Sequence, residues 1–116
     1  MSIEADLKQL LVAINPNTWP DVAPSGAATP YLTWQQLGGA SVRYGDNTAD
    51  SRWPLIQINA WAKTRLEAIT LIRQVEDALC ASSAFQAEPQ GEPVSTYEPD
   101  TKLYGSIQRF EVFGAR

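Results

Sequence analysis

Acidic side chains come nearest to a reactive centre in this chain, by residue type and by spacing. Glu76 and Asp77 are adjacent, and Glu98 and Asp100 are two residues apart; paired carboxylates of this kind can perform acid–base catalysis. However, Arg73 precedes the first pair by three and four residues, which is the spacing of a solvated helix face, and the second pair lies in a proline-containing polar connection. We therefore interpret both pairs as solvent-facing carboxylates.

A second acidic segment resembles the beginning of a calcium-binding loop. Asp46, Thr48 and Asp50 have the required alternation. The sixth position, however, is Ser51 where glycine is needed, and the twelfth is Gln57 where a bidentate glutamate is needed. The segment therefore does not predict a calcium site, and we expect neither a metal nor another cofactor.

Nucleophilic catalysis also lacks its usual residues. The chain has no histidine, which is the commonest general base and the commonest metal ligand. Cys80 is the single cysteine, so neither an internal disulfide nor a cysteine metal cluster is possible. No base lies near it in the sequence, and we interpret it as a small buried hydrophobic residue. We predict that the protein is not an enzyme.

Chain length, net charge and hydropathy further limit the classes of protein to which this chain can belong. The 116 residues suit one domain, residues 1–116, with one core. The net charge of −4 argues against tight binding to nucleic-acid phosphates, which requires clustered lysine and arginine. No apolar run reaches the length of a membrane span, and the first residues are acidic where a signal peptide is basic. We expect the protein to remain in the cytoplasm of the cell that makes it, without membrane contact.

The predicted secondary structure is organised around residues 53–79, where a strand is followed directly by a long helix. In residues 53–61, one side carries Ile56, Ile58 and Ala60, and the alternating positions put Leu55, Gln57, Asn59 and Trp61 on the other. This period of two predicts a strand. Thr64 and Glu67 then form a capping box that begins a helix. The apolar stripe predicted for this helix consists of Leu66, Ile69, Ile72, Val75 and Leu79.

The flanking segments supply one more helix and additional strands. The spacing of Ile3, Leu7, Leu10, Leu11 and Ile14 predicts a first helix that stops before Pro16. β-Forming composition predicts a main strand over 31–37, a final strand over 103–113, and short strands around Trp19 and over 85–87. Residues 45–51 suit a long hairpin loop. Prolines and acidic residues predict irregular surface connections over 18–30 and 88–102.

These elements predict an α+β two-layer sandwich, with an antiparallel sheet of about four strands and both helices packed on one face. The other face would then carry Trp34 or Trp61 together with Gln57 and Asn59. The chain has four tryptophans and four tyrosines, more than one small core needs, and large aromatic side chains on a sheet surface often contact a partner.

Three segments together resemble one known family. They are residues 19–24 (Trp-Pro-Asp-Val-Ala-Pro) leading through 29–31 to Trp34 and Gln35, residues 56–62 (Ile-Gln-Ile-Asn-Ala-Trp-Ala), and residues 97–105 around Tyr-Glu-Pro-Asp-Thr. Their order and spacing resemble the tail-completion proteins of long-tailed bacteriophages, also called tail terminators or tail-to-head joining proteins. The resemblance covers nearly the whole chain, and relatives occur in prophages and gene transfer agents.

The resemblance implies a structural virion protein of α+β fold. Members of the family form rings, commonly hexameric, on the last ring of the tail tube, stop tail growth and dock to the head connector. The implied partners are copies of the chain itself, the tail tube protein and a head-side connector or stopper, and genomic DNA would pass through the ring without specific binding. The implied location is the virion tail, with assembly in the host cytoplasm.

The residue pattern suggests where a ring subunit would contact its neighbours. We expect Trp34, Trp53, Trp61 and Arg43 to anchor an interface, since aromatic residues and arginine dominate such contacts. Trp53 precedes Pro54, which suggests a strand at the sheet edge; a core position is the alternative for Trp61. The polar loop that would reach a neighbour or the tube comprises Asp46, Asn47, Thr48, Ala49 and Asp50.

Two other functions remain open on the sequence. One is a head-side neck stopper or adaptor, or another minor tail protein. The other, from a different class, is a small ligand-binding or enzymatic α+β domain with a pocket between sheet and helices. The missing histidine and the unsupported Cys80 weigh against this second alternative.

Overall fold

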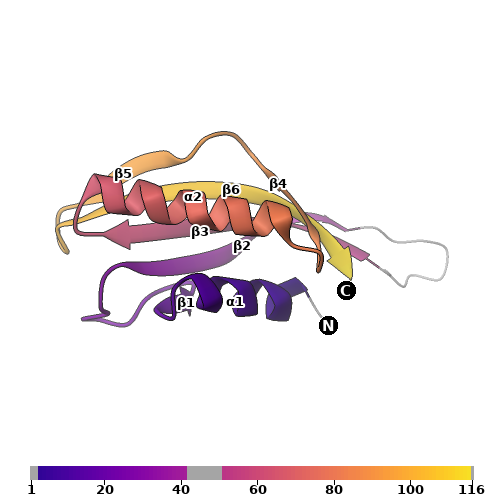
Figure 1. Ribbon diagram of the computed structural model, residues 1–116, viewed down its shortest axis with the longest axis horizontal. Helices are drawn as coiled ribbons and strands as arrows, with labels where there is room; N and C mark the ends of the chain where they lie inside the picture. The colour runs from indigo at the N-terminus through magenta and orange to yellow at the C-terminus, as the bar shows by residue number, and fades with distance from the viewer. Residues whose placement is uncertain (1–2, 42–50, 116) are drawn as a thin grey trace.

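The computed structural model describes residues 3–41 and 51–115, with side chains described over 3–38 and 54–114. The described part contains two helices and six strands (Figure 1). In chain order they are α1 (Ile3–Ile14), β1 (Thr18–Pro20), β2 (Tyr31–Ser41), β3 (Ser51–Ala62), α2 (Arg65–Ala81), β4 (Gln86–Pro89), β5 (Val94–Glu98) and β6 (Leu103–Ala115).

The strands form one sheet in the order β1-β2-β3-β6-β4, and β5 also pairs with β6. β1 runs parallel to β2, while the other pairings are antiparallel. β6 has β3 along one side and two strands along the other, with β5 opposite its beginning and β4 opposite its end. The α+β class is therefore confirmed, but the described sheet is mixed and six-stranded where about four antiparallel strands were predicted.

The prediction of an irregular connection over residues 88–102 was wrong, because the segment contains β5. Pro93 and Pro99 stand immediately before and after the strand. A proline at either end removes no hydrogen-bond donor from within the ladder, so the prolines bound the strand instead of preventing it.

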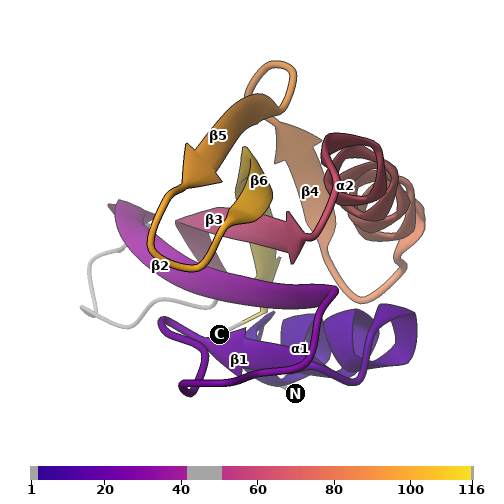
Figure 2. The same cartoon turned by 90° about the vertical axis from the view of Figure 1, so that its left-hand side faces the viewer.

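Both helices pack on one face of the sheet, as predicted (Figure 2). Alternate residues of the central strands point into this layer, including Leu32 and Trp34 of β2 and Ile56, Ile58 and Ala60 of β3. They meet the apolar faces of the two helices. The helical members of this core are Ile3, Leu7 and Leu11 of α1 and Leu71, Ile72, Val75 and Leu79 of α2.

The predicted start of α2 is confirmed and its apolar stripe is partly corrected. Thr64 caps the helix, and its Oγ1 accepts a hydrogen bond from the Glu67 amide at 3.2 Å. Leu66, however, is 75% exposed, whereas Ala68 and Leu71 are buried. Leu66 lies in the first turn and faces away from the core; the buried stripe begins at Ala68.

β3 is a central strand, so the prediction that Trp53 lies at a sheet edge was wrong. The Cα of Trp53 pairs with that of Ala40 in β2, and β6 pairs with β3 on its other side. Pro54 is accommodated beside a register shift in β2, between Gln36 and Gly39. Such irregularities are among the few places where a sheet interior accepts proline.

Asn15 ties the end of α1 to the beginning of β2. Its side chain is only 8% exposed. Its Nδ2 donates to the Pro30 carbonyl at 2.9 Å, and its Oδ1 accepts from the Asn17 amide at 2.9 Å. Because a buried amide is costly unless it is hydrogen-bonded, these contacts fix where the chain enters β2 and where the preceding 21–30 segment must lie.

Candidate functional site

The face of the sheet opposite the helices carries the candidate site. Residues 57, 59 and 61 of β3 alternate with its core residues and are half-buried, which places Trp61 on this face as one of the two predicted possibilities. Trp34 points the other way, into the core. Register places the following residues beside Trp61 on the helix-free face: Tyr31, Thr33, Gln35, Gln57, Asn59, Gly105, Ile107 and Arg109.

A row of hydrogen-bonded polar side chains crosses three strands of this face. Arg109 Nε donates to Gln57 Oε1 at 3.2 Å, and Gln57 Nε2 donates to Asn59 Oδ1 at 3.1 Å. Asn59 Nδ2 then donates to Thr33 Oγ1 at 3.2 Å. These bonds link β6, β3 and β2 on the surface and hold each side chain in one orientation.

Trp61 lies directly on the backbone of β6. Its Cα partner is Gly105, and a Cβ at that position would be 2.7 Å from the Trp61 Cζ3 atom and 2.8 Å from the Thr96 Cγ2 atom. These distances are too short for any side chain, so glycine is required for the indole to occupy this position. The close packing fixes the ring against the sheet.

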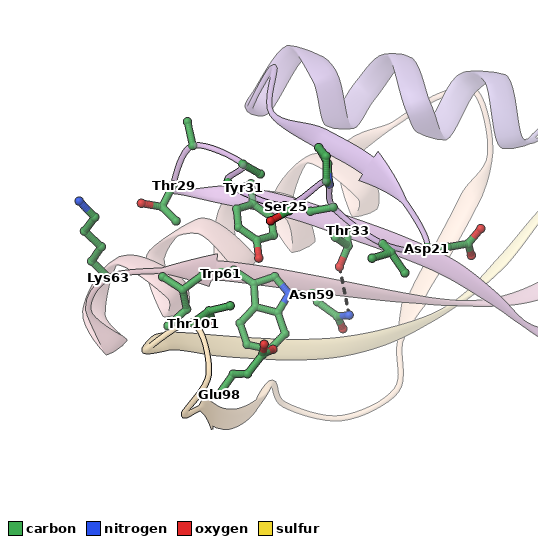
Figure 3. A pocket seen from close by; sticks show the side chains of 17 residues that line it. Asp21, Ser25, Thr29, Tyr31, Thr33, Asn59, Trp61, Lys63, Glu98 and Thr101 are labelled. Carbon is green, nitrogen blue, oxygen red and sulfur yellow. Dashed lines mark hydrogen bonds between the residues drawn. The ribbon is translucent and has the colours of Figure 1, made fainter.

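A cleft of about 690 Å³ opens beside Trp61 (Figure 3). One wall is the 21–29 segment that connects β1 to β2, and the other is the end of β5 with the turn into β6. Tyr31, Thr33, Asn59 and Trp61 form the floor, and Tyr31 and Trp61 are direct cross-strand partners. Glu98, Thr101 and Lys63 line the side nearer β5.

The charges in the cleft are not neutralised internally. Glu98 and Trp61 line the same cleft, and in Figure 3 the Lys63 side chain extends away from it. Among the described residues, Glu98 takes part in no ion pair and its carboxylate accepts no hydrogen bond. Burial, and secondly the charge of Glu98, raise the pKa of the Tyr31 hydroxyl above its usual value. Tyr31 is therefore a neutral phenol at physiological pH.

The structure separates the predicted interface residues. Trp34 is 7% exposed and belongs to the core; it faces the helices because it lies opposite Ile58 in the register. Trp61 is on the helix-free face. The side chain of Trp53 lies outside the described side chains. Arg43, Asp46, Asn47, Thr48, Ala49 and Asp50 lie outside the described residues.

Sequence reasoning used residues 19–24, 29–31 and 97–105 for the family resemblance, but it gave Tyr31, the 21–29 segment and Glu98 no role in a site. Tyr31 has the same strand parity as Thr33, so it lies on the opposite face from Trp34. Its position opposite Trp61, however, depends on the register of β2 against β3. No residue pattern in the sequence predicted that register. The position of Glu98 depends on β5, which was predicted to be an irregular connection.

Cys80 is exposed, so the prediction that it is buried was wrong. It lies near the end of α2, and its sulfur is 3.8 Å from the Ala87 carbonyl oxygen. Desolvation raises the pKa of its thiol, and the nearby charges of Glu76 and Asp77 raise it further. These effects disfavour the thiolate, which is the opposite of what a nucleophilic cysteine requires.

Other kinds of site find little support in the described residues. Nowhere in residues 3–41 and 51–115 do three or more cysteine or acidic side chains gather in a way that could hold a metal ion. Within the same residues, neither helix is long and apolar enough to cross a membrane.

Comparison with protein-family models gives a match over residues 4–113 to the family described as "Tail completion protein gp17". The chain belongs to this family. The match spans both helices and all six described strands up to residue 113 of β6, which confirms the resemblance noted in the sequence. A tail-completion protein is a structural component of phage tail assembly, and its place is the virion tail. A comparison with curated protein sequences gives no match.

Proposed function

We propose that this tail-completion protein forms a hexameric ring that caps the tail tube, terminates tail growth and joins the tail to the head connector. The family match over nearly the whole chain is the observation that carries the proposal. The tube protein and a head-side connector or stopper are the proposed partners. In this role the protein catalyses no reaction and acts by binding to other proteins of the tail.

The sheet has the two different surfaces that a closed ring needs. A head-to-tail ring joins one patch of each subunit to a different patch of the next. β1 lies at one edge of the sheet, and β5 and β4 lie at the opposite edge. β5 is the most exposed strand of the described part, with Val94 64% and Tyr97 47% exposed. Exposed edge strands of this kind readily pair with another chain.

The hairpin of β2 and β3 supports a second contact. The Cα atoms of Ser41 and Arg52 pair, so the strands remain joined up to the connection between them. We propose that residues 46–50 of this connection, together with Arg43 and Trp53, reach a neighbouring subunit or the tube. Replacing residues 47–49 by a tight turn should then abolish assembly, and unchanged assembly would exclude the connection from the interface.

The acidic character of the chain suits a ring through which DNA passes. A net charge of −4 offers no general attraction to phosphate, so a genome would not be retained on the wall of the channel. We therefore propose passage of DNA without specific binding.

Electron microscopy of tails made without this protein tests the proposal. We expect abnormally long tails that lack heads, because nothing would cap the tube. Tails of normal length with unattached heads would instead indicate a neck protein of the head side. Light scattering of the purified protein, alone and with tube protein, measures ring formation; a protein that stays monomeric in both samples contradicts the ring.

A further inference from the structure

The cleft beside Trp61 combines two aromatic rings with a carboxylate that has no partner. We propose that it receives an arginine side chain from a neighbouring protein of the tail, an inference that rests on the proposed structural role. The chemistry is that of a cation held between aromatic faces and a negative charge. Each component can be traced to a described contact.

The aromatic component is built into the sheet. Tyr31 and Trp61 are cross-strand partners on the floor of the cleft, and Gly105 allows the indole to lie fixed on β6. A cation over the face of a tryptophan or tyrosine is attracted by the ring quadrupole. A guanidinium group is planar and weakly hydrated, so it stacks on such rings better than an ammonium group does.

The carboxylate component comes from β5. Glu98 lines the same cleft as Trp61 (Figure 3), and among the described residues it takes part in no ion pair. Lys63, a basic residue that lines the same cleft, extends away from it. A guanidinium stacked on Trp61 could therefore pair with Glu98, and this charge-assisted contact is stronger than a neutral hydrogen bond.

Size and surroundings favour a side chain on a polypeptide over a bare ion. The cleft holds about 690 Å³, which is within the range that accommodates a side chain with flanking backbone. Beyond Asn59 the hydrogen-bonded row continues along the same face to Arg109. A partner segment could place its arginine in the cleft and align its backbone with these fixed polar groups.

A peptide titration tests the cleft independently of ring formation. The probe is N-acetyl-Gly-Arg-Gly-amide, and its control contains citrulline, which has the same shape without the charge. The readout is the indole N–H signal of Trp61 in the nuclear magnetic resonance spectrum, assigned with Trp61→Phe. We expect saturable shifts with the arginine peptide, at a dissociation constant on the order of 10 mM, and much smaller shifts with citrulline. Equal shifts from both peptides would overturn the proposal.

Two matched variants test the role of the carboxylate. Glu98→Gln should weaken binding of the arginine peptide roughly threefold, as expected for an exposed ion pair. Glu88→Gln makes the same chemical change on β4, the other strand that pairs with this side of β6, and Glu88 does not line the cleft. It should leave binding unchanged. Equal affinities for Glu98→Gln and the parent protein would overturn the assignment.

A charge reversal tests whether tail assembly uses the cleft. Glu98→Arg places a cation where one is expected to bind, and it should lower the yield of infectious particles at least about tenfold, since like charges at an interface are strongly unfavourable. Glu4→Arg is the control, because Glu4 is exposed on α1, outside both edge strands of the sheet and outside the cleft. A normal yield with folded Glu98→Arg protein would overturn the proposed partner contact. It would leave the ring proposal intact, because that proposal is tested by tail length in the absence of the protein.

Discussion

Gly105 should not tolerate even a methyl group as long as Trp61 is present. The Cβ of alanine would lie 2.7 Å from Trp61 Cζ3 and 2.8 Å from Thr96 Cγ2, about 1 Å closer than the roughly 3.5–4.0 Å of a favourable carbon–carbon contact. Overpacking of this kind costs about 1–3 kcal/mol. Against it stands a gain of about 0.5–1 kcal/mol from replacing a strand glycine. We expect Gly105→Ala to lower the free energy of unfolding by about 1 kcal/mol, the middle of a net range of about 0–2.5 kcal/mol.

A mutant cycle identifies the cause of this loss. Urea unfolding followed by circular dichroism measures the effect of Gly105→Ala in the parent and in a Trp61→Ala/Thr96→Ser background. In that background the two nearest atoms are gone, so the substitution should be neutral or stabilising. Gly91→Ala is the control: φ is +87° at Gly91 and nothing lies within 4 Å of the added Cβ, so its cost should be the same in both backgrounds. If Gly105→Ala costs as much without Trp61 as with it, the indole does not lie on β6 as described.

Three further predictions concern single groups. Asn15→Ala should lower the free energy of unfolding in urea by about 1–3 kcal/mol, because it removes the two hydrogen bonds that the buried Asn15 side chain makes with the Pro30 carbonyl and the Asn17 amide; an unchanged midpoint would contradict this. Burial and the charge of Glu98 raise the pKa of Tyr31 in the folded protein above its value in the unfolded chain. The stability of the fold that is linked to this shift is therefore fully present below the unfolded pKa and is lost as pH rises through the folded pKa. Ultraviolet absorbance should therefore show a late-titrating tyrosine that is absent in Tyr31→Phe, and the alkaline loss of stability should be smaller in that variant. Cys80 has a raised pKa and should react with iodoacetamide at pH 8 more slowly than free cysteine does; an equal or faster rate would show that the thiolate is not disfavoured.

The sequence was sufficient to predict the elements whose structure depends on local residue patterns. Thr64 and Glu67 predicted the start of α2 because a capping box consists of local hydrogen bonds. The alternation of Ile56, Ile58 and Ala60 predicted which face of β3 would be buried, and the structure confirms it. α1 likewise buries Ile3, Leu7 and Leu11 as their spacing indicated.

Features that depend on pairing between distant segments could not be predicted in the same way. β5 is held by its ladder with β6, and its own composition, bounded by prolines, indicated a connection. The alternation in β3 placed Trp61 on the face opposite Ile56 and Ile58, but the strand of Trp34 has mixed faces, so only its pairing with Ile58 assigns Trp34 to the core. The cleft itself requires Tyr31, Trp61 and Glu98 to meet from three strands, and no local pattern encodes that meeting.

The place of β6 in the sheet has a consequence for biosynthesis. β6 follows all the strands that it joins, and β3, β4 and β5 meet only through it. On the ribosome, β4 and β5 therefore have no strand to pair with until β6 emerges, and non-local pairing of this kind is slow. A truncated polypeptide lacking β6 would be a substrate for chaperones and proteases, which would keep incomplete subunits out of growing particles.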